Sequence, residues 1–209
     1  GGTLTDIYVS SGNDFAFTKT LTTPVDLSQC LFDAMTKASE VIYGEPNLSG
    51  LLHSTQHIRY SSTQGTNALI EHNGPKLGLL VDDVDILAEL RHDARSCSLL
   101  DDIVGDRTAI VPNELDGDEL NSALVDEVTR LTTAGAERIV LAASSQTRER
   151  LLKHIILERF PRHLLGSVPV LFSWEFAADK VRARRIWSGI INSFLHPTVE
   201  RFLYSTEQR

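Results

Sequence analysis

The chain has 209 residues, of which 42% are hydrophobic, and its 20 basic and 28 acidic residues give a net charge of −8. This length allows one sizeable core, and the acidic balance, without any lysine or arginine run, argues against binding to nucleic acid. Cys30 and Cys97 share no motif that indicates a disulfide framework or a zinc site. A helix that crosses a bilayer needs about 20 apolar residues, and no apolar run in the sequence is nearly that long. We therefore expect a cytoplasmic protein that makes no membrane contact.

The first predicted elements are two strands and a helix. Residues 5–10 and 15–21 alternate between polar and apolar side chains around a run of turn-forming residues, which predicts an antiparallel hairpin. Asp26 and Gln29 have the spacing of a capping box. Apolar residues then recur at helical spacing, namely Leu27, Leu31, Ala34, Met35, Ala38, Val41 and Ile42.

The rest of the chain alternates strands with helices, while the stretch from residue 92 to residue 106 follows no clear period. Strands alternating with helices predict an α/β fold, with a mixed sheet flanked by helices and followed by C-terminal helices. The predicted strands are 57–62, 76–81, 139–143 and 168–174, and the predicted helices are 66–72, 84–91, 120–131, 148–160, 181–194 and a closing helix that begins near Pro197.

The opening stretch GGTLTD has the residue types of a phosphate-binding loop. Gly1 and Gly2 let the backbone approach an anion closely, and Thr3, Thr5 and Asp6 add hydroxyls and a carboxylate for phosphate or Mg²⁺. An ordinary turn before the hairpin explains the same residues.

A second polar segment precedes the predicted helix at 66–72. Thr63, Gly65, Thr66 and Asn67 can offer backbone N–H groups and a helix dipole to an anion or a carbonyl oxygen. Alternatively, Thr66 simply caps the helix.

Other charged and histidine side chains point less clearly to a site. His53 and His57 lie four residues apart but lead into a predicted strand, where this spacing does not converge on a metal ion. Three arginines could bind bicarbonate or phosphate, although a solvated or interface helix face explains them as well; they are Arg182, Arg184 and Arg185. The residues alone indicate no catalytic group and no metal site.

Several segments in register resemble the hydantoinase A/oxoprolinase family. They are GGTLTD, RYSSTQGTNALIEHNGPKLGLL, FPRHLLGSVPVLFS and RRIWSGIINSFLHPTVERFLY, which occur in the family's order from Gly1 to about Glu207. Within the family, the second segment and FLHPTVERFLY are most similar to subunits of the ATP-dependent ketone carboxylases that act on acetone or acetophenone.

The resemblance implies one half of an actin-like fold with a ribonuclease-H-like sheet, over residues 1–209 as one region or as lobes 1–83 and 84–209. It implies that Gly1, Gly2 and Thr3 approach nucleotide phosphates, and that Thr5 and Asp6 support the loop or hold Mg²⁺ through water. The family's second polar segment is matched by Thr63, Gly65, Thr66 and Asn67.

The implied function is that of a subunit in a hetero-oligomer with a larger hydantoinase A-like subunit and a hydantoinase B-like subunit. Such a complex uses ATP and Mg²⁺, without biotin, to carboxylate a small ketone. Two alternatives remain open, which are ATP-dependent opening of a cyclic amide and a non-catalytic, shortened copy that serves the complex structurally.

Departures from the family pattern favour the shortened copy. Family members carry an aspartate and a strand before the two glycines, so we expect the given sequence to begin inside a longer polypeptide. They also continue into a second half after the FLHP helix, which does not follow here. The family's N-P-x-H-E signature is SSQTRE here and keeps only Glu149. We also expect the apolar closing helices to present an uncovered surface, through Trp187, Phe194, Phe202, Leu203 and Tyr204.

Overall fold

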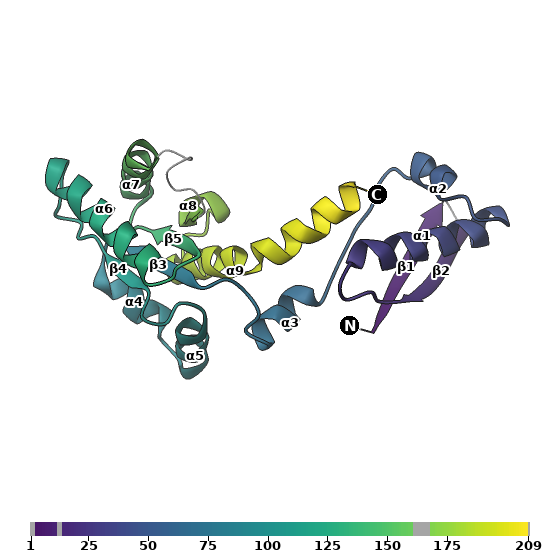
Figure 1. Cartoon of the computed structure of the whole chain (residues 1–209), viewed down its shortest axis with the longest axis horizontal. Helices are drawn as coiled ribbons and strands as arrows, with labels where there is room; N and C mark the ends of the chain where they lie inside the picture. Colours follow the sequence, from purple (N-terminus) through teal and green to yellow (C-terminus); the bar gives the residue numbers. More distant parts are fainter. Residues whose placement is uncertain (1–2, 12–13, 161–167, 209) are drawn as a thin grey trace. The chain divides into compact units, whose positions relative to one another are not determined.

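The computed structural model describes residues 3–11, 14–160 and 168–208. These residues form two compact units, one bounded by Gly1–Glu71 together with Thr198–Arg209, and one by His72–Pro197. We call them the hairpin unit and the sheet unit, and Figure 1 labels their helices and strands.

The hairpin unit begins with the predicted antiparallel pair. Strand β1 (Leu4–Ser11) pairs with β2 (Asp14–Leu21) along its whole length, so that Tyr8 lies opposite Phe17. Because side chains alternate along a strand, one face of this ribbon packs on helix α1 (Leu27–Tyr43), and the other face carries Tyr8 and Phe17. The hairpin prediction is confirmed.

Helix α1 is fixed at both ends and along its buried side. The Asp26 side chain accepts a hydrogen bond from the backbone N–H of Ser28 at 3.0 Å, and Gly44 ends the helix with φ 80°. Ala34 and Ala38 are fully buried, and the hydroxyl of Thr18 donates to the Ala34 carbonyl at 3.1 Å. Small side chains therefore let the helix lie close against the ribbon.

The prediction of a strand at residues 57–62 is wrong. These residues are exposed and follow helix α2 (Leu48–Ser54) without entering a ladder, and helix α3 (Gln64–Ile70) begins soon after them. The ring of Tyr60 stacks instead on that of Phe202, with centroids 4.4 Å apart. Alternating residues form a strand only where a neighbouring strand supplies hydrogen bonds.

The sheet unit contains a parallel sheet with strand order β4-β3-β5-β6. The central strand β3 is buried at all five positions, as parallel strands covered on both faces are. The strands are β3 (Leu77–Val81), β4 (Thr108–Ile110), β5 (Arg138–Ala142) and β6 (Val170–Phe172). The predicted α/β fold with helices flanking a sheet is confirmed, but the sheet is parallel and not mixed in the described residues, because the antiparallel hairpin forms a sheet of its own.

Helices cover both faces of this sheet. Helices α6 (Gly117–Thr133) and α7 (Gln146–Arg159) share a core with Leu80 and Leu141 on one face. On the other face Gly189 of α9 (Arg182–Glu207) lies against Val140, since a Cβ added at Gly189 would stand 3.4 Å from Val140 Cγ1. The described residues of the unit also form helices α4 (Val84–Leu90), α5 (Ala94–Ile103) and α8 (Ser173–Phe176).

Two predictions about the last third of the chain need correction. The strand predicted at 168–174 ends at Phe172, because the next residues leave the ladder to bond a buried carboxylate and form α8. The break predicted near Pro197 is absent, since this proline lies inside α9, where it removes one backbone hydrogen bond without ending the helix.

The expectation of uncovered closing helices holds only at their end. Phe194 is buried at 3% exposure, whereas Leu203 and Tyr204 are 60% and 58% exposed. In the described part of the chain, no helix is both long enough and apolar enough to cross a membrane.

Candidate functional site

The strand order of the sheet unit indicates where a ligand site is expected. From β3 the chain moves to β4 on one side, and from β4 it crosses back to β5 on the other side. Right-handed crossovers then place the connecting helices on opposite faces. Adjacent strands whose connections leave to opposite faces form a crevice at their carboxyl ends, which is where α/β sheets bind ligands. In this sheet that position lies between the carboxyl ends of β3 and β5, and we call it the sheet edge.

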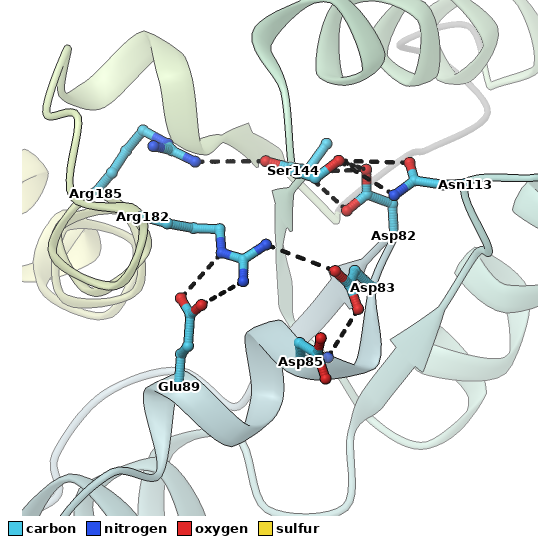
Figure 2. Close-up of polar contacts among 9 residues, drawn as sticks. Asp82, Asp83, Asp85, Glu89, Asn113, Ser144, Arg182 and Arg185 are labelled. Carbon is cyan, nitrogen blue, oxygen red and sulfur yellow. Dashed lines mark hydrogen bonds and ion pairs between the residues drawn. The ribbon is translucent and has the colours of Figure 1, made fainter.

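A polar cluster occupies that edge (Figure 2). Asp82 directly follows β3 and is only 2% exposed. Its carboxylate accepts hydrogen bonds from the backbone N–H of Ser144, at 2.8 and 3.0 Å, and from the Ser144 hydroxyl at 2.8 Å. The amide nitrogen of Asn113, beyond β4, donates to the same hydroxyl at 3.2 Å. Residues from three strand ends are thereby joined, and a buried carboxylate is balanced by donors.

An arginine from α9 lies beside this cluster (Figure 2). The Arg182 guanidinium makes a two-pronged contact with Glu89 of α4, with Nε at 2.9 Å from Oε2, and stands 3.6 Å from the carboxylate of Asp83. The hydrogen bond from Arg182 holds the pKa of Glu89 below its usual value. Asp83 also caps α4 by accepting the N–H of Asp85 at 2.9 Å.

A second buried carboxylate, that of Glu149, binds the residue that precedes Ser144. Glu149 of α7 is 2% exposed and accepts hydrogen bonds from the hydroxyl of Ser173 at 2.7 Å and from the backbone N–H groups of Trp174 at 2.7 Å and Ala143 at 3.2 Å. Burial raises the pKa of Glu149, and these hydrogen bonds oppose the rise. The one glutamate kept from the family signature thus joins β5, β6 and α7.

The cation of this second network is Arg185 of α9, which is 1% exposed. Its guanidinium donates to the carbonyl of Asp179 at 3.1 Å and to that of Ala143 at 3.4 Å, and it lies 3.8 Å from the centre of the Trp174 ring. Burial lowers the pKa of Arg185. The interpretation of the three arginines as one solvated or interface face is wrong for Arg185, which is internal. Arg182 pairs with Glu89, and Arg184 pairs with Asp179.

The predicted phosphate loop lies in the other unit. Gly1 and Gly2 lie outside the described residues. Thr3 accepts the backbone N–H of Thr22 at 3.0 Å through its carbonyl, which closes the open end of the hairpin. The Thr5 hydroxyl lies 3.0 Å from that of Thr22 and donates to the sulfur of Cys30 at 3.2 Å, so its side chain faces α1.

Asp6 lies on the opposite face of the ribbon from Thr5. Its carboxylate is 3.2 Å from Nζ of Lys19, and both side chains are 53% exposed. The two side chains therefore cannot converge on one ion, and only Asp6 is accessible to a ligand on the outer face. Their part in phosphate binding stays a prediction.

The second predicted segment lies at the start of α3. Thr63 occupies the N-cap position without a side-chain cap bond, and the hydroxyl of Ser62 accepts the N–H of Gln64 at 3.1 Å. Thr66 and Asn67 lie inside the helix with Gly65, so the interpretation of Thr66 as the cap is wrong. Anion binding by this segment stays a prediction.

Sequence reasoning did not identify the edge cluster of Asp82, Asn113 and Ser144. Polar residues follow buried strands in VDD and ASS, which signals strand ends. The sequence does not state which strands are neighbours, and neighbouring strands are what bring these residues together. Chemically, the cluster offers the Ser144 hydroxyl and the Asn113 amide to a polar ligand, while the buried carboxylate of Asp82 holds Ser144 in place.

Comparison with known proteins adds the family. The family described as hydantoinase/oxoprolinase N-terminal region matches residues 1–140. The acetophenone carboxylase gamma subunit of Aromatoleum aromaticum is 24% identical to this chain over 99% of its length, and the match covers 31% of that subunit. The chain therefore spans about a third of the length of this curated relative.

Two solved structures share the fold. A nucleotide-free structure of acetone carboxylase matches 99% of this chain and 32% of its own, with a TM-score of 0.76 and 21% identity. The ATP-dependent caprolactamase from Pseudomonas jessenii matches the same shares, with a TM-score of 0.69 and 16% identity.

Proposed function

Because the chain belongs to the hydantoinase/oxoprolinase family, we propose that it works as a subunit of an ATP-dependent ketone carboxylase. In this proposal the complex consumes ATP and bicarbonate, carboxylates a small ketone such as acetone or acetophenone, and needs no biotin. The partners are a larger hydantoinase A-like subunit and a hydantoinase B-like subunit.

One observation carries the proposal, which is the similarity to the acetophenone carboxylase gamma subunit over 99% of this chain. The fold shared with acetone carboxylase is consistent with it. ATP would supply a phosphoryl group that activates an oxygen of bicarbonate or of the ketone's enolate. Catalysis of that kind rests on positioning and charge stabilisation, which polar groups held on a rigid scaffold can provide.

We further propose that this chain supports the complex without carrying the phosphoryl transfer itself. Thr5 is engaged with α1, and Asp6 is paired with Lys19. The competing proposal is that Thr3, Thr5 and Asp6, with the two glycines before them and the segment Thr63, Gly65, Thr66 and Asn67, contact the phosphates and Mg²⁺ of ATP.

A second reaction is favoured by a specific observation, the shared fold with ATP-dependent caprolactamase. Opening a cyclic amide also requires ATP to activate an oxygen, so the scaffold suits both reactions. The two differ in whether carbon from bicarbonate enters the product.

The test is an assay of the purified complex with ATP and labelled bicarbonate against a panel of ketones, hydantoins and lactams. We expect ATP-dependent transfer of label into an acidic product from a ketone. ATP consumption coupled to ring opening, without label in the product, would establish the cyclic amide reaction instead.

The supporting role is tested in the same assay with Asp6→Ala. We expect turnover to stay within a few-fold of the unmodified complex. Lys19→Ala is the matched control, because it breaks the same ion pair but keeps the carboxylate. A hundredfold loss with Asp6→Ala alone would assign the phosphate contact to this chain, since groups that act as a unit lose function together.

A further inference from the structure

The outer face of the hairpin, opposite α1, is unusually apolar for a surface in contact with water. Antiparallel sheets with one solvated face normally place polar side chains on it. Here the face carries two leucines and three aromatic rings, and their exposed fractions are high: Leu4 43%, Tyr8 66%, Phe15 71%, Phe17 53% and Leu21 73%. Exposed apolar side chains gathered in this way mark an interaction surface.

The face is ordered in rows that the register defines. Leu4 lies opposite Leu21, Asp6 opposite Lys19, and Tyr8 opposite Phe17. Phe15 stacks on Tyr8 at 6.0 Å between ring centroids, and Nζ of Lys19 lies 5.3 Å from the centre of the Phe17 ring. One charged row therefore lies between an aliphatic row and an aromatic cluster.

This pattern is complementary to itself. A two-fold axis running along the strands would stack each row on the same row of a second copy while exchanging the two strands. Asp6 would then lie over the second copy's Lys19, Tyr8 over the second copy's Phe17, and Leu4 over the second copy's Leu21. No like charges meet in this arrangement.

The amount of apolar surface suits such a contact. With 150–250 Å² for a whole aromatic side chain, the exposed parts of the three rings amount to about 400 Å². A stable interface buries about 800 Å² per partner, so the rings alone supply about half, and Leu4, Leu21, Asp6 and Lys19 add to it. Sheets that stack face to face pack about 10 Å apart, which the paired side chains would fill.

We propose that the outer face of the hairpin binds the same face of a second copy of this chain, forming a two-fold symmetric dimer. The proposal does not depend on the reaction proposed above. Its test uses the purified full chain without substrates, so it can fail while the proposed function stands, and the reverse.

The first measurement is sedimentation velocity of the full chain across a hundredfold range of concentration. We expect a monomer–dimer equilibrium that Phe17→Asp weakens at least tenfold. Asp33→Lys is the matched control, because Asp33 is an exposed residue of α1, and it should leave the equilibrium unchanged. Circular dichroism verifies that each variant keeps its helix content.

The deciding measurement mixes two charge variants. Asp6→Lys makes the charged row wholly positive and Lys19→Asp makes it wholly negative, so each variant alone should dimerise at least tenfold more weakly. An equimolar mixture should recover association, because each positive row meets a negative row. A hairpin whose ion pair serves only its own chain would show no recovery.

Three outcomes would overturn the proposal. They are a wild-type chain that stays monomeric over the whole range, a mixture that associates no better than its components, and a dimer that Phe17→Asp leaves intact. A monomer would assign the apolar face to a different polypeptide, such as a helix of another subunit.

Discussion

The two sheets in the described part of the chain differ in how their apolar faces are covered. In the sheet unit, β3 is buried at every position and helices lie on both faces. In the hairpin unit, α1 covers one face of the ribbon, while Tyr8, Phe15 and Phe17 on the other are more than half exposed. The sheet unit can therefore close its core by itself, whereas a two-stranded ribbon is at best marginal without further packing.

The difference also separates the polar groups. The sheet unit buries two carboxylates, Asp82 and Glu149, and surrounds each with donors. The ion pair of the ribbon, Asp6 with Lys19, is half exposed. Removing a partner of a buried charge is costly, whereas an exposed pair stabilises the ribbon by little.

Natural probes distinguish the units. Both tryptophans, Trp174 and Trp187, belong to the sheet unit, and the four tyrosines belong to the hairpin unit; these are Tyr8, Tyr43, Tyr60 and Tyr204. Unfolding of each unit can thus be followed in the intact chain.

The largest effect is expected for Glu149→Ala. The substitution leaves three donors without their acceptor and removes the negative charge of Glu149 that acts on buried Arg185, and such changes cost about 3–5 kcal/mol. A urea titration followed by tryptophan fluorescence measures the loss. Glu158→Ala, on the exposed side of the same helix, should change stability by less than about 0.5 kcal/mol. A loss below about 1 kcal/mol for Glu149→Ala would mean that the network contributes little.

How far the sequence predicts the fold depends on the range of the interactions involved. The hairpin and the helix at 27–43 were predictable, because alternation, turn residues and the Asp26 cap are local signals. The helix at 94–103 escaped prediction, although Asp93 caps it through two backbone N–H groups, since its apolar residues are sparse.

Features that depend on residues far apart in the sequence were predicted wrongly or not at all. The strand predicted at 57–62 finds no ladder, and Ser173 and Trp174 leave the sheet to bond Glu149. The cluster of Asp82, Asn113 and Ser144 exists only because β3 lies between β4 and β5. Strand order is a property of the folded sheet, and no spacing in the sequence encodes it.

The next effect is expected at the sheet edge. Asp82→Ala removes the acceptor for the N–H and the hydroxyl of Ser144, and an unsatisfied buried donor costs about 1–3 kcal/mol. Tryptophan fluorescence in urea again reports the loss. Asp85→Ala, an exposed neighbour at the start of α4, is the control. If both substitutions lowered the free energy of unfolding equally, the burial of Asp82 would not be the cause of its contribution.

A third prediction concerns the covered face of the ribbon. Ala38 of α1 is fully buried in the core of the hairpin unit. Ala38→Leu should therefore overpack this core at a cost of about 1–3 kcal/mol. We expect the tyrosine absorbance transition to move to lower urea while the tryptophan transition stays in place. Asp33→Leu on the exposed side of α1 is the matched control. A shift in both transitions would mean that the units unfold together.

The smallest effect is a pH dependence at the Arg182–Glu89 pair. The lowered pKa of Glu89 in the folded state means that its ionised form adds stability at neutral pH, and that this stability is lost as the pH falls through the lowered pKa. Glu89→Gln should cost less than about 1 kcal/mol at neutral pH, because the pair is partly exposed. The difference between variant and wild type should vanish in acid, and a difference that grows in acid would contradict the assignment.

The most direct test of the contrast between the two units is equilibrium unfolding of the full chain at several protein concentrations. If a second copy covers the open face of the ribbon, mass action must stabilise the hairpin unit as concentration rises. We predict that the tyrosine midpoint moves to higher urea with concentration while the tryptophan midpoint does not. Tyrosine and tryptophan midpoints that are both independent of concentration would contradict the account.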